Sequence, residues 1–227
     1  MDIFKNTGRI VGILFLTLMV AYIIGAFLID PILSSPNYLV EASKNKNNLL
    51  IGVLFETING VAYLGIAVLL YPILKKFSES LALLYIGFRI IEFAMQMISD
   101  MSPLLLISLS QDFIVSKIQG TSSFESLGSI LLELRFWANQ MVFITYSLGA
   151  IIFYYSTYQL KLIPRFLSIW GLIGAPLVLV NVFFDSWEIS IGIDLGIVMG
   201  LNEIVLGIWL VVKGFNTLQK QVRPSQN

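Results

Sequence analysis

Four polar side chains lie inside an otherwise apolar stretch and share a helical spacing. Arg89, Glu92, Gln96 and Asp100 follow an i, i+3, i+7, i+11 pattern, which places them along one stripe of a helix. Carboxylate, guanidinium and amide groups together can hold a cation, exchange a proton or bind a small polar ligand. Because such a stripe is untenable against lipid, we expect it to face the interior of a helix bundle.

Other apolar stretches carry polar residues that can meet this stripe. A rise of about 1.5 Å per residue places Glu56 and Glu203 roughly 10 to 12 Å below the outer ends of their helices, level with Glu92. The predicted polar cluster, which is also the predicted ligand site, comprises Glu56, Asn59, Arg89, Glu92, Gln96, Asn139, Asn202 and Glu203. The predicted rim of this cluster comprises Asp100, Glu133, Arg135 and Asn181.

The charges of this cluster do not cancel. Three carboxylates face Arg89, which leaves two negative charges, or one where Arg135 reaches the cluster. A low-dielectric site does not hold bare charges. We therefore expect at least one carboxyl to be protonated, to bind a cation or to be reached by water.

The chain contains no histidine and no cysteine, and this excludes several kinds of chemistry. It can form no disulfide, thiolate nucleophile, imidazole base or Cys/His metal site. We accordingly expect no cofactor, no metal site and no catalytic residue. With 14 basic and 14 acidic side chains, no stretch concentrates enough Lys and Arg to bind nucleic acid.

The elements that must position these residues are membrane-spanning helices. Of the 227 residues, 57% are hydrophobic and 12% are charged, about half the charge of an ordinary soluble domain. We predict an all-α polytopic membrane protein, with a single domain over 1–227 and six transmembrane helices in one bundle. The expected spans are approximately 9–29, 49–74, 80–102, 135–157, 166–184 and 195–212.

Two segments outside these spans also show patterns that bear on secondary structure. Apolar pattern continues past Asp100 to Ile107 and resumes at Leu127, so the hairpin of the third and fourth helices is expected to project beyond the membrane. The segment 36–48 is compatible with a short interfacial helix, but its Ser-Lys-Asn-Lys-Asn-Asn run favours a solvated loop.

The distribution of Lys and Arg predicts the orientation in the bilayer, which is the expected partner of the apolar surface. If six spans alternate, three basic residues lie on one side, namely Lys44, Lys46 and Lys117. The other side carries nine, namely Lys5, Arg9, Lys75, Lys76, Lys161, Arg165, Lys213, Lys220 and Arg223. The positive-inside rule then places both termini in the cytoplasm.

Five stretches of the chain carry a family resemblance: 9–14, 69–75, 87–92, 164–168 and 203–207. Together they resemble a bacterial membrane family known only as domain of unknown function 4386, over roughly Arg9 to Phe215. The resemblance implies a six-helix, multi-pass protein of the bacterial cytoplasmic (inner) membrane. It implies no activity, because none is assigned to the family.

Three functions fit these observations. The leading hypothesis is a polar cluster open toward the outer face that binds or moves a proton, a cation or a small polar ligand. Six helices without a convincing inverted repeat fall short of the usual transporter pattern, so movement would require a homo-oligomer. The alternative is a structural or regulatory membrane subunit whose cluster only holds helices together. An intramembrane carboxylate-based enzyme is favoured least, because no aspartyl-protease motif, serine nucleophile elbow or metal set is present, and the sequence leans toward a non-enzyme.

Overall fold

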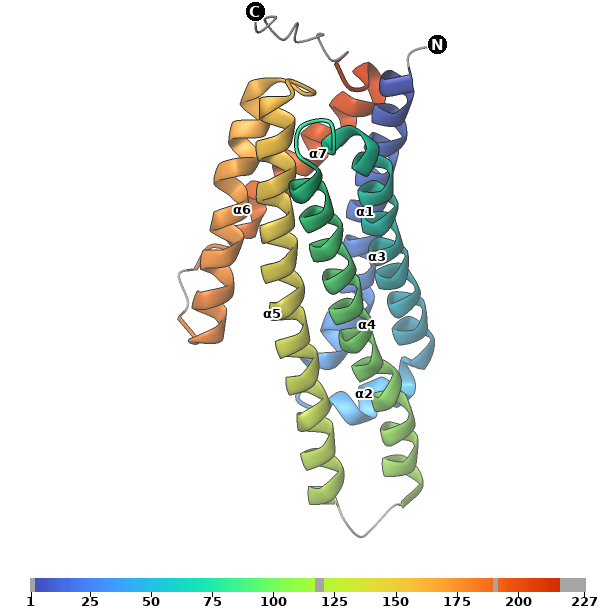
Figure 1. The fold of residues 1–227 in the computed structure, drawn as a ribbon. Helices are drawn as coiled ribbons and strands as arrows, with labels where there is room; N and C mark the ends of the chain where they lie inside the picture. Colours follow the sequence, from blue (N-terminus) through green and yellow to red (C-terminus); the bar gives the residue numbers. More distant parts are fainter. Residues whose placement is uncertain (1–2, 117–120, 190–191, 217–227) are drawn as a thin grey trace, which may run out of the picture.

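The computed structural model describes residues 3–116, 121–189 and 192–216, and in these ranges the chain is helical with no strand. The helices are α1 (Ile3–Leu33), α2 (Tyr38–Lys44), α3 (Lys46–Leu74), α4 (Glu79–Ser116), α5 (Thr121–Gln159), α6 (Arg165–Ser186) and α7 (Gly196–Lys213), as Figure 1 shows. All of the described helices except the short α2 are long and apolar enough to cross a membrane. Their outward faces carry large apolar side chains such as Phe27, Val68 and Ile208. The prediction of an all-α polytopic bundle with six spans is therefore confirmed.

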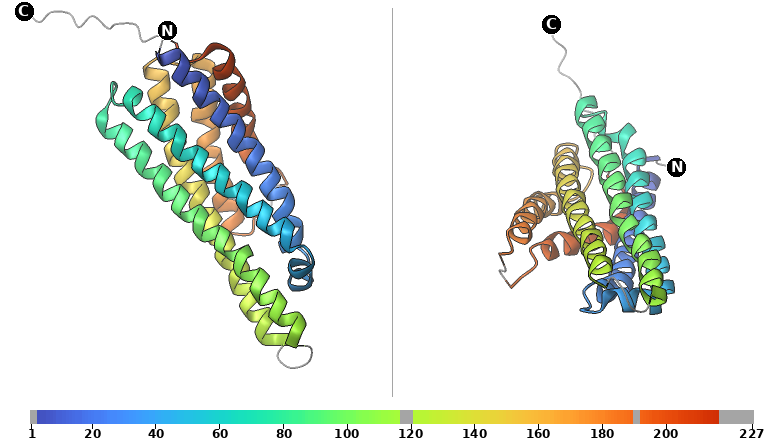
Figure 2. Two further views of the ribbon diagram at one scale, coloured as in Figure 1. Left: turned by 90° about the vertical axis from the view of Figure 1, so that its right-hand side faces the viewer. Right: turned by 90° about the horizontal axis from the view of Figure 1, so that it is seen from below.

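The six long helices form a ring. Within the described residues, α1, α3, α4, α5, α6 and α7 pack side by side in that order, and α7 packs back against α1. The view from below in Figure 2 shows α6 on one side of α5 and α1, α3 and α4 on the other, with α7 running obliquely between α6 and α1. Polar side chains that cannot face lipid are thereby placed inside the ring.

The hairpin of α4 and α5 projects beyond the ends of the other helices, as predicted (Figures 1 and 2). These two helices contain 38 and 39 residues, which corresponds to a length of almost 60 Å each. The expected spans at 80–102 and 135–157 are therefore much shorter than the helices that contain them.

A short helix occupies part of the segment for which a solvated loop was favoured. Leu39 and Ala42 of α2, three residues apart, are both buried, and this pair anchors the turn against the neighbouring helices. The loop was favoured because of the polar run that follows Ala42. The two buried apolar residues lie before that run. The structure thus supports the interfacial helix that the sequence also allowed.

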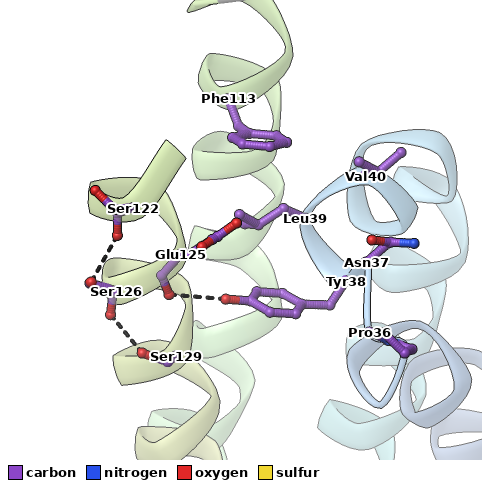
Figure 3. Close-up of a pocket in the computed structure, with 10 residues that line it drawn as sticks. All are labelled: Pro36, Asn37, Tyr38, Leu39, Val40, Phe113, Ser122, Glu125, Ser126 and Ser129. Carbon is purple, nitrogen blue, oxygen red and sulfur yellow. Dashed lines mark hydrogen bonds between the residues drawn. The ribbon is translucent and has the colours of Figure 1, made fainter. Parts of the chain in front are cut away.

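Figure 3 shows how α2 meets the projecting hairpin. The hydroxyl of Tyr38 donates a hydrogen bond to the carbonyl oxygen of Glu125 at 3.1 Å. Burial and the nearby Glu125 carboxylate raise the pKa of the Tyr38 hydroxyl, so it remains a donor at neutral pH. Gly128 leaves the space for this ring, because a Cβ there would lie 2.5 Å from the tyrosine oxygen.

Close backbone approach closes the ring between α1 and α7. A Cβ at Gly12 would lie 2.7 Å from the backbone nitrogen of Val211 and 2.9 Å from the carbonyl oxygen of Gly207. Backbone atoms cannot move aside as a flexible side chain can. The interface therefore requires a residue without a side chain at this position.

We expect Gly12→Ala to lower the free energy of unfolding by about 1–3 kcal/mol, because the added methyl overpacks the α1–α7 interface. The measurement is the Tm of the purified protein in detergent. Gly87→Ala is the matched control, since a Cβ there meets nothing within 4 Å. It should leave the Tm unchanged or slightly raised, because alanine favours helix. Equal Tm values for the two variants would contradict this account of the interface.

Candidate functional site

A buried ion pair joins α3 to α5. Arg135 donates from Nη2 to Oε1 of Glu56 at 2.7 Å and from Nη1 to Oε2 at 3.1 Å. Both side chains are buried. Such bidentate pairing is the strongest common form of a guanidinium–carboxylate contact. Each charge therefore has a counter charge inside the ring.

Residues of α4 and α1 extend this pair. Gln96 Nε2 donates to Asp100 Oδ1 at 2.8 Å and to Glu56 Oε2 at 3.4 Å. From α1, Asp30 Oδ1 lies 4.0 Å from Arg135 Nη2. Asp100 Oδ2 is buried and has no hydrogen-bond partner among the described residues. Glu56 and Asp30 thus share one guanidinium, and Asp100 is a further buried carboxyl that forms no ion pair with a described residue.

A second buried ion pair lies within α4. Arg89 Nη1 donates to Glu92 Oε2 at 2.8 Å. The rings of Tyr63, Tyr85 and Tyr146 surround the guanidinium, with centroids 5.2 to 5.3 Å from Cζ. Cation–π attraction supplements the ion pair at such distances. In the described part of the chain, Arg89 Nε and Glu92 Oε1 have no hydrogen-bond partner.

Glu203 of α7 is buried but forms no ion pair with any described residue. Its Oε1 accepts a hydrogen bond from the hydroxyl of Tyr146 at 2.6 Å. The adjacent Asn202 accepts from Tyr154 at 2.6 Å and donates to the carbonyl oxygen of Leu167 at 3.1 Å. Asn202 therefore ties α7 to α5 and α6, whereas Glu203 is left as a carboxyl without a counter charge.

Glu56, Arg135 and Glu203 line a cavity of about 500 Å³ inside the ring, called here the acidic cavity. Its walls come from all six long helices. Its ionisable lining, apart from tyrosines, consists of Asp30, Glu56, Asp185, Asp194, Glu203 and Arg135. Asp30, Asp185 and Asp194 are exposed and form the mouth, where α1 and α6 end and α7 begins. These three are the rim carboxylates. Five carboxylates thus face one guanidinium.

The structure divides the predicted cluster between the wall of the acidic cavity and the helix contacts behind it. The predicted residues that line the cavity are Glu56, Asn59, Gln96, Arg135, Asn139, Asn181 and Glu203. Those buried but outside the lining are Arg89, Glu92, Asp100 and Asn202. Glu133 is exposed and lies apart from the cavity. Arg135 and Asp100, expected at the rim, are buried because α4 and α5 continue far beyond the expected spans.

Sequence reasoning missed the rim carboxylates and the tyrosines that line the cavity. None of the three aspartates was among the predicted site residues, although each stands at the end of a predicted span. That shared position was the available signal, since these three helix ends lie at the same end of the bundle. Tyr63 and Tyr146 resemble core residues in an apolar helix, and only the fold shows that they face a cavity.

A second hollow, of about 530 Å³, lies between α2 and the projecting hairpin (Figure 3). Two of its serines satisfy their hydroxyls within their own helix, since Ser126 donates to the carbonyl oxygen of Ser122 and Ser129 to that of Ser126. No buried charge lines it. The acidic cavity is therefore the better candidate for a site.

The acidic cavity offers single carboxyls and amides, without a cluster of metal ligands in its described lining. Among the described residues, no group of three or more acidic side chains is placed to hold a metal ion. The lining instead combines single carboxyls with the amides of Asn59, Gln96, Asn139 and Asn181. Such a wall can hold a charged group by one carboxyl and orient it by hydrogen bonds.

We expect Arg135→Met to lower the free energy of unfolding by about 3–5 kcal/mol, because it leaves Glu56 buried without a counter charge. The double variant Glu56→Met/Arg135→Met should lose less than Arg135→Met alone, since it removes both charges. Chemical unfolding in detergent micelles measures this coupling. Glu133→Met combined with Arg135→Met is the control, and its effects should add because Glu133 is exposed. Additive effects for Glu56 and Arg135 would contradict the ion pair.

The comparisons with known proteins concern the family alone. A family model described as "Domain of unknown function (DUF4386)" matches residues 10–214. Neither the curated proteins nor the solved structures gave a match. The matched range covers most of the chain and confirms the resemblance carried by the five stretches at 9–14, 69–75, 87–92, 164–168 and 203–207. The chain belongs to the DUF4386 family.

Proposed function

We propose that this protein binds a small cation in the acidic cavity and takes it from the outer side of a bacterial cytoplasmic membrane. The observation that carries the proposal is Glu203, a carboxyl that is only 5% exposed, lines the cavity and has no cationic partner among the described residues. An ionised carboxylate in such a place needs a counter charge. A bound cation supplies it.

The distribution of charge around the cavity supports the same conclusion. Five carboxylates and one guanidinium line it, and Arg135 is already engaged by Glu56. The rim carboxylates are exposed at the mouth, where a negative potential raises the local concentration of cations. Binding uses residues of one chain, and movement of the cation across the membrane would involve a homo-oligomer, as the absence of an inverted repeat suggests.

The proposed orientation rests on the positive-inside rule. Lys5, Lys75, Lys161 and Lys213 all belong to the end of the bundle opposite the mouth of the acidic cavity. With this end in the cytoplasm, the mouth opens to the outside. The family resemblance supports a bacterial inner membrane.

A structural role is the second candidate, and the buried ion pair between α3 and α5 favours it. Glu56–Arg135 can hold the ring together without any ligand, and Arg89 adds contacts to the rings of Tyr63 and Tyr146 on the same two helices. This role does not explain why Glu203 has no ion-pair partner among the described residues or why the rim is acidic. An enzyme has no supporting observation among the described side chains.

We expect Glu203→Gln to abolish stabilisation by cations, because it removes the carboxylate that a cation would neutralise. The wild-type protein should gain up to about 2.7 kcal/mol when a bound cation reaches a hundredfold its Kd. The measurement is the Tm in detergent during titration with sodium, potassium, calcium and n-butylammonium chlorides.

Glu133→Gln is the matched control, since Glu133 is exposed outside the cavity and should leave the response intact. Each salt is applied to all three proteins, which removes general effects of ionic strength. The proposal fails if no cation raises the Tm of the wild type more than that of Glu203→Gln.

Single cysteines test the orientation directly, because the chain contains no cysteine. Lys46→Cys and Lys75→Cys replace exposed lysines at opposite ends of α3. In intact bacterial cells, a membrane-impermeant maleimide should label Lys46→Cys and spare Lys75→Cys until the cells are lysed. Labelling of Lys75→Cys in intact cells would reverse the proposed orientation.

A further inference from the structure

The acidic cavity carries carboxyls at two depths. Glu203 lies at its floor, beside Tyr63 and Tyr146, whose ring centroids are 6.2 Å apart. The rim carboxylates stand at the mouth. A floor that carries one carboxyl suits an ammonium group, because the carboxylate neutralises its charge and accepts charge-assisted hydrogen bonds from it.

The two levels are separated by a defined length of α7. Asp194 Oδ1 accepts a hydrogen bond from the backbone nitrogen of Gly196 at 2.7 Å, which fixes this carboxylate at the start of the helix. Glu203 follows seven residues after Gly196, a rise of about 10 Å. Asp185 accepts from Asn181 Nδ2 at 2.9 Å, so a second rim carboxylate is also held in place.

The wall between these levels is largely apolar on the side of α5, α6 and α7. It includes Val142, Phe143, Val178, Val182 and Met199. A hydrated inorganic ion gains nothing from such a wall, whereas a hydrocarbon chain is stabilised by leaving water. A volume of about 500 Å³ also falls in the range of pockets for small organic molecules.

We infer that the cation is a linear diamine or polyamine, bound with one ammonium group at Glu203 and another at the rim carboxylates. Its methylene chain lies along the apolar wall between them. This inference rests on the proposed function and specifies the substrate class of the same cavity. It accounts for the presence of carboxylates at both levels, since a ligand with one positive charge could contact only one level at a time.

The length dependence of binding tests the inference. Isothermal titration calorimetry in detergent compares the α,ω-diamines of butane, hexane, octane and decane with the n-alkylamines of the same carbon number. Once a diamine spans both levels, its second ammonium binds intramolecularly, and its Kd should be at least about tenfold lower than that of the matched monoamine. Diamines and monoamines of equal affinity at every length would overturn the inference.

Variants of the rim separate the two ends of the ligand. Asp30→Asn, Asp185→Asn and Asp194→Asn change exposed side chains only, and their triple variant should remove the advantage of diamines. Measured at 0.15 M salt, monoamine affinity should fall only about twofold, because Glu203 is untouched and salt screens the rim potential beyond a Debye length of about 8 Å. An advantage of diamines that survives the triple variant would contradict binding at the rim.

The outcomes also distinguish this inference from the proposed function. Binding of monoamines or inorganic cations that depends on Glu203, with no advantage for diamines, overturns the polyamine inference and leaves the cation site intact. Absence of any cation binding that depends on Glu203 removes both.

Discussion

The ion pair between Arg135 and Glu56 joins helices that are not neighbours in the ring, since α4 lies between α3 and α5. To meet, the two side chains must reach across the interior. Separating the two charged side chains would leave each unpaired in a low-dielectric interior, which is costly. The pair therefore holds α3 and α5 at a fixed distance. Gln96 of α4 adds a hydrogen bond to the same carboxylate. Three of the six long helices are therefore positioned by one polar contact, and the cavity is the space that remains beside it.

The sequence carried enough information for the ring and for part of its lining. Helical spacing and depth place Glu56, Gln96 and Glu203 toward one interior, and all three line the acidic cavity. The same reasoning put Arg89 with them, because spacing reveals a shared face but not the size of neighbouring side chains. Large tyrosine rings lie around the guanidinium, and Arg89 does not line the cavity. Arg135 was expected at the mouth because hydropathy began its span there, whereas the helix begins at Thr121.

The rim carboxylates illustrate a different limit of sequence reasoning. Asp30 and Asp185 are far apart in the chain, and each ends a helix in the manner of many loop acids. Which helix ends meet depends on the order of the ring, and apolar periodicity does not encode that order. Only the closing of α7 onto α1 and α6 brings these ends of the helices together. An aspartate that resembles an ordinary loop residue in the sequence thus becomes part of a cavity in the fold.

The structural and ligand-binding roles need not compete, because different side chains serve each. The ion pair of Arg135 and Glu56 joins α5 to α3. Arg89, which pairs with Glu92 of its own helix, joins α4 to its neighbours through the rings of Tyr63 and Tyr146, and these contacts account for helix association. Tyr146 stands between the two sets: its ring faces Arg89 while its hydroxyl donates to Glu203. Arg89 is thereby kept near Glu203 without forming an ion pair with it. These contacts thus leave Glu203 without an ion pair among the described residues, and a cavity that opens to solvent leads to it.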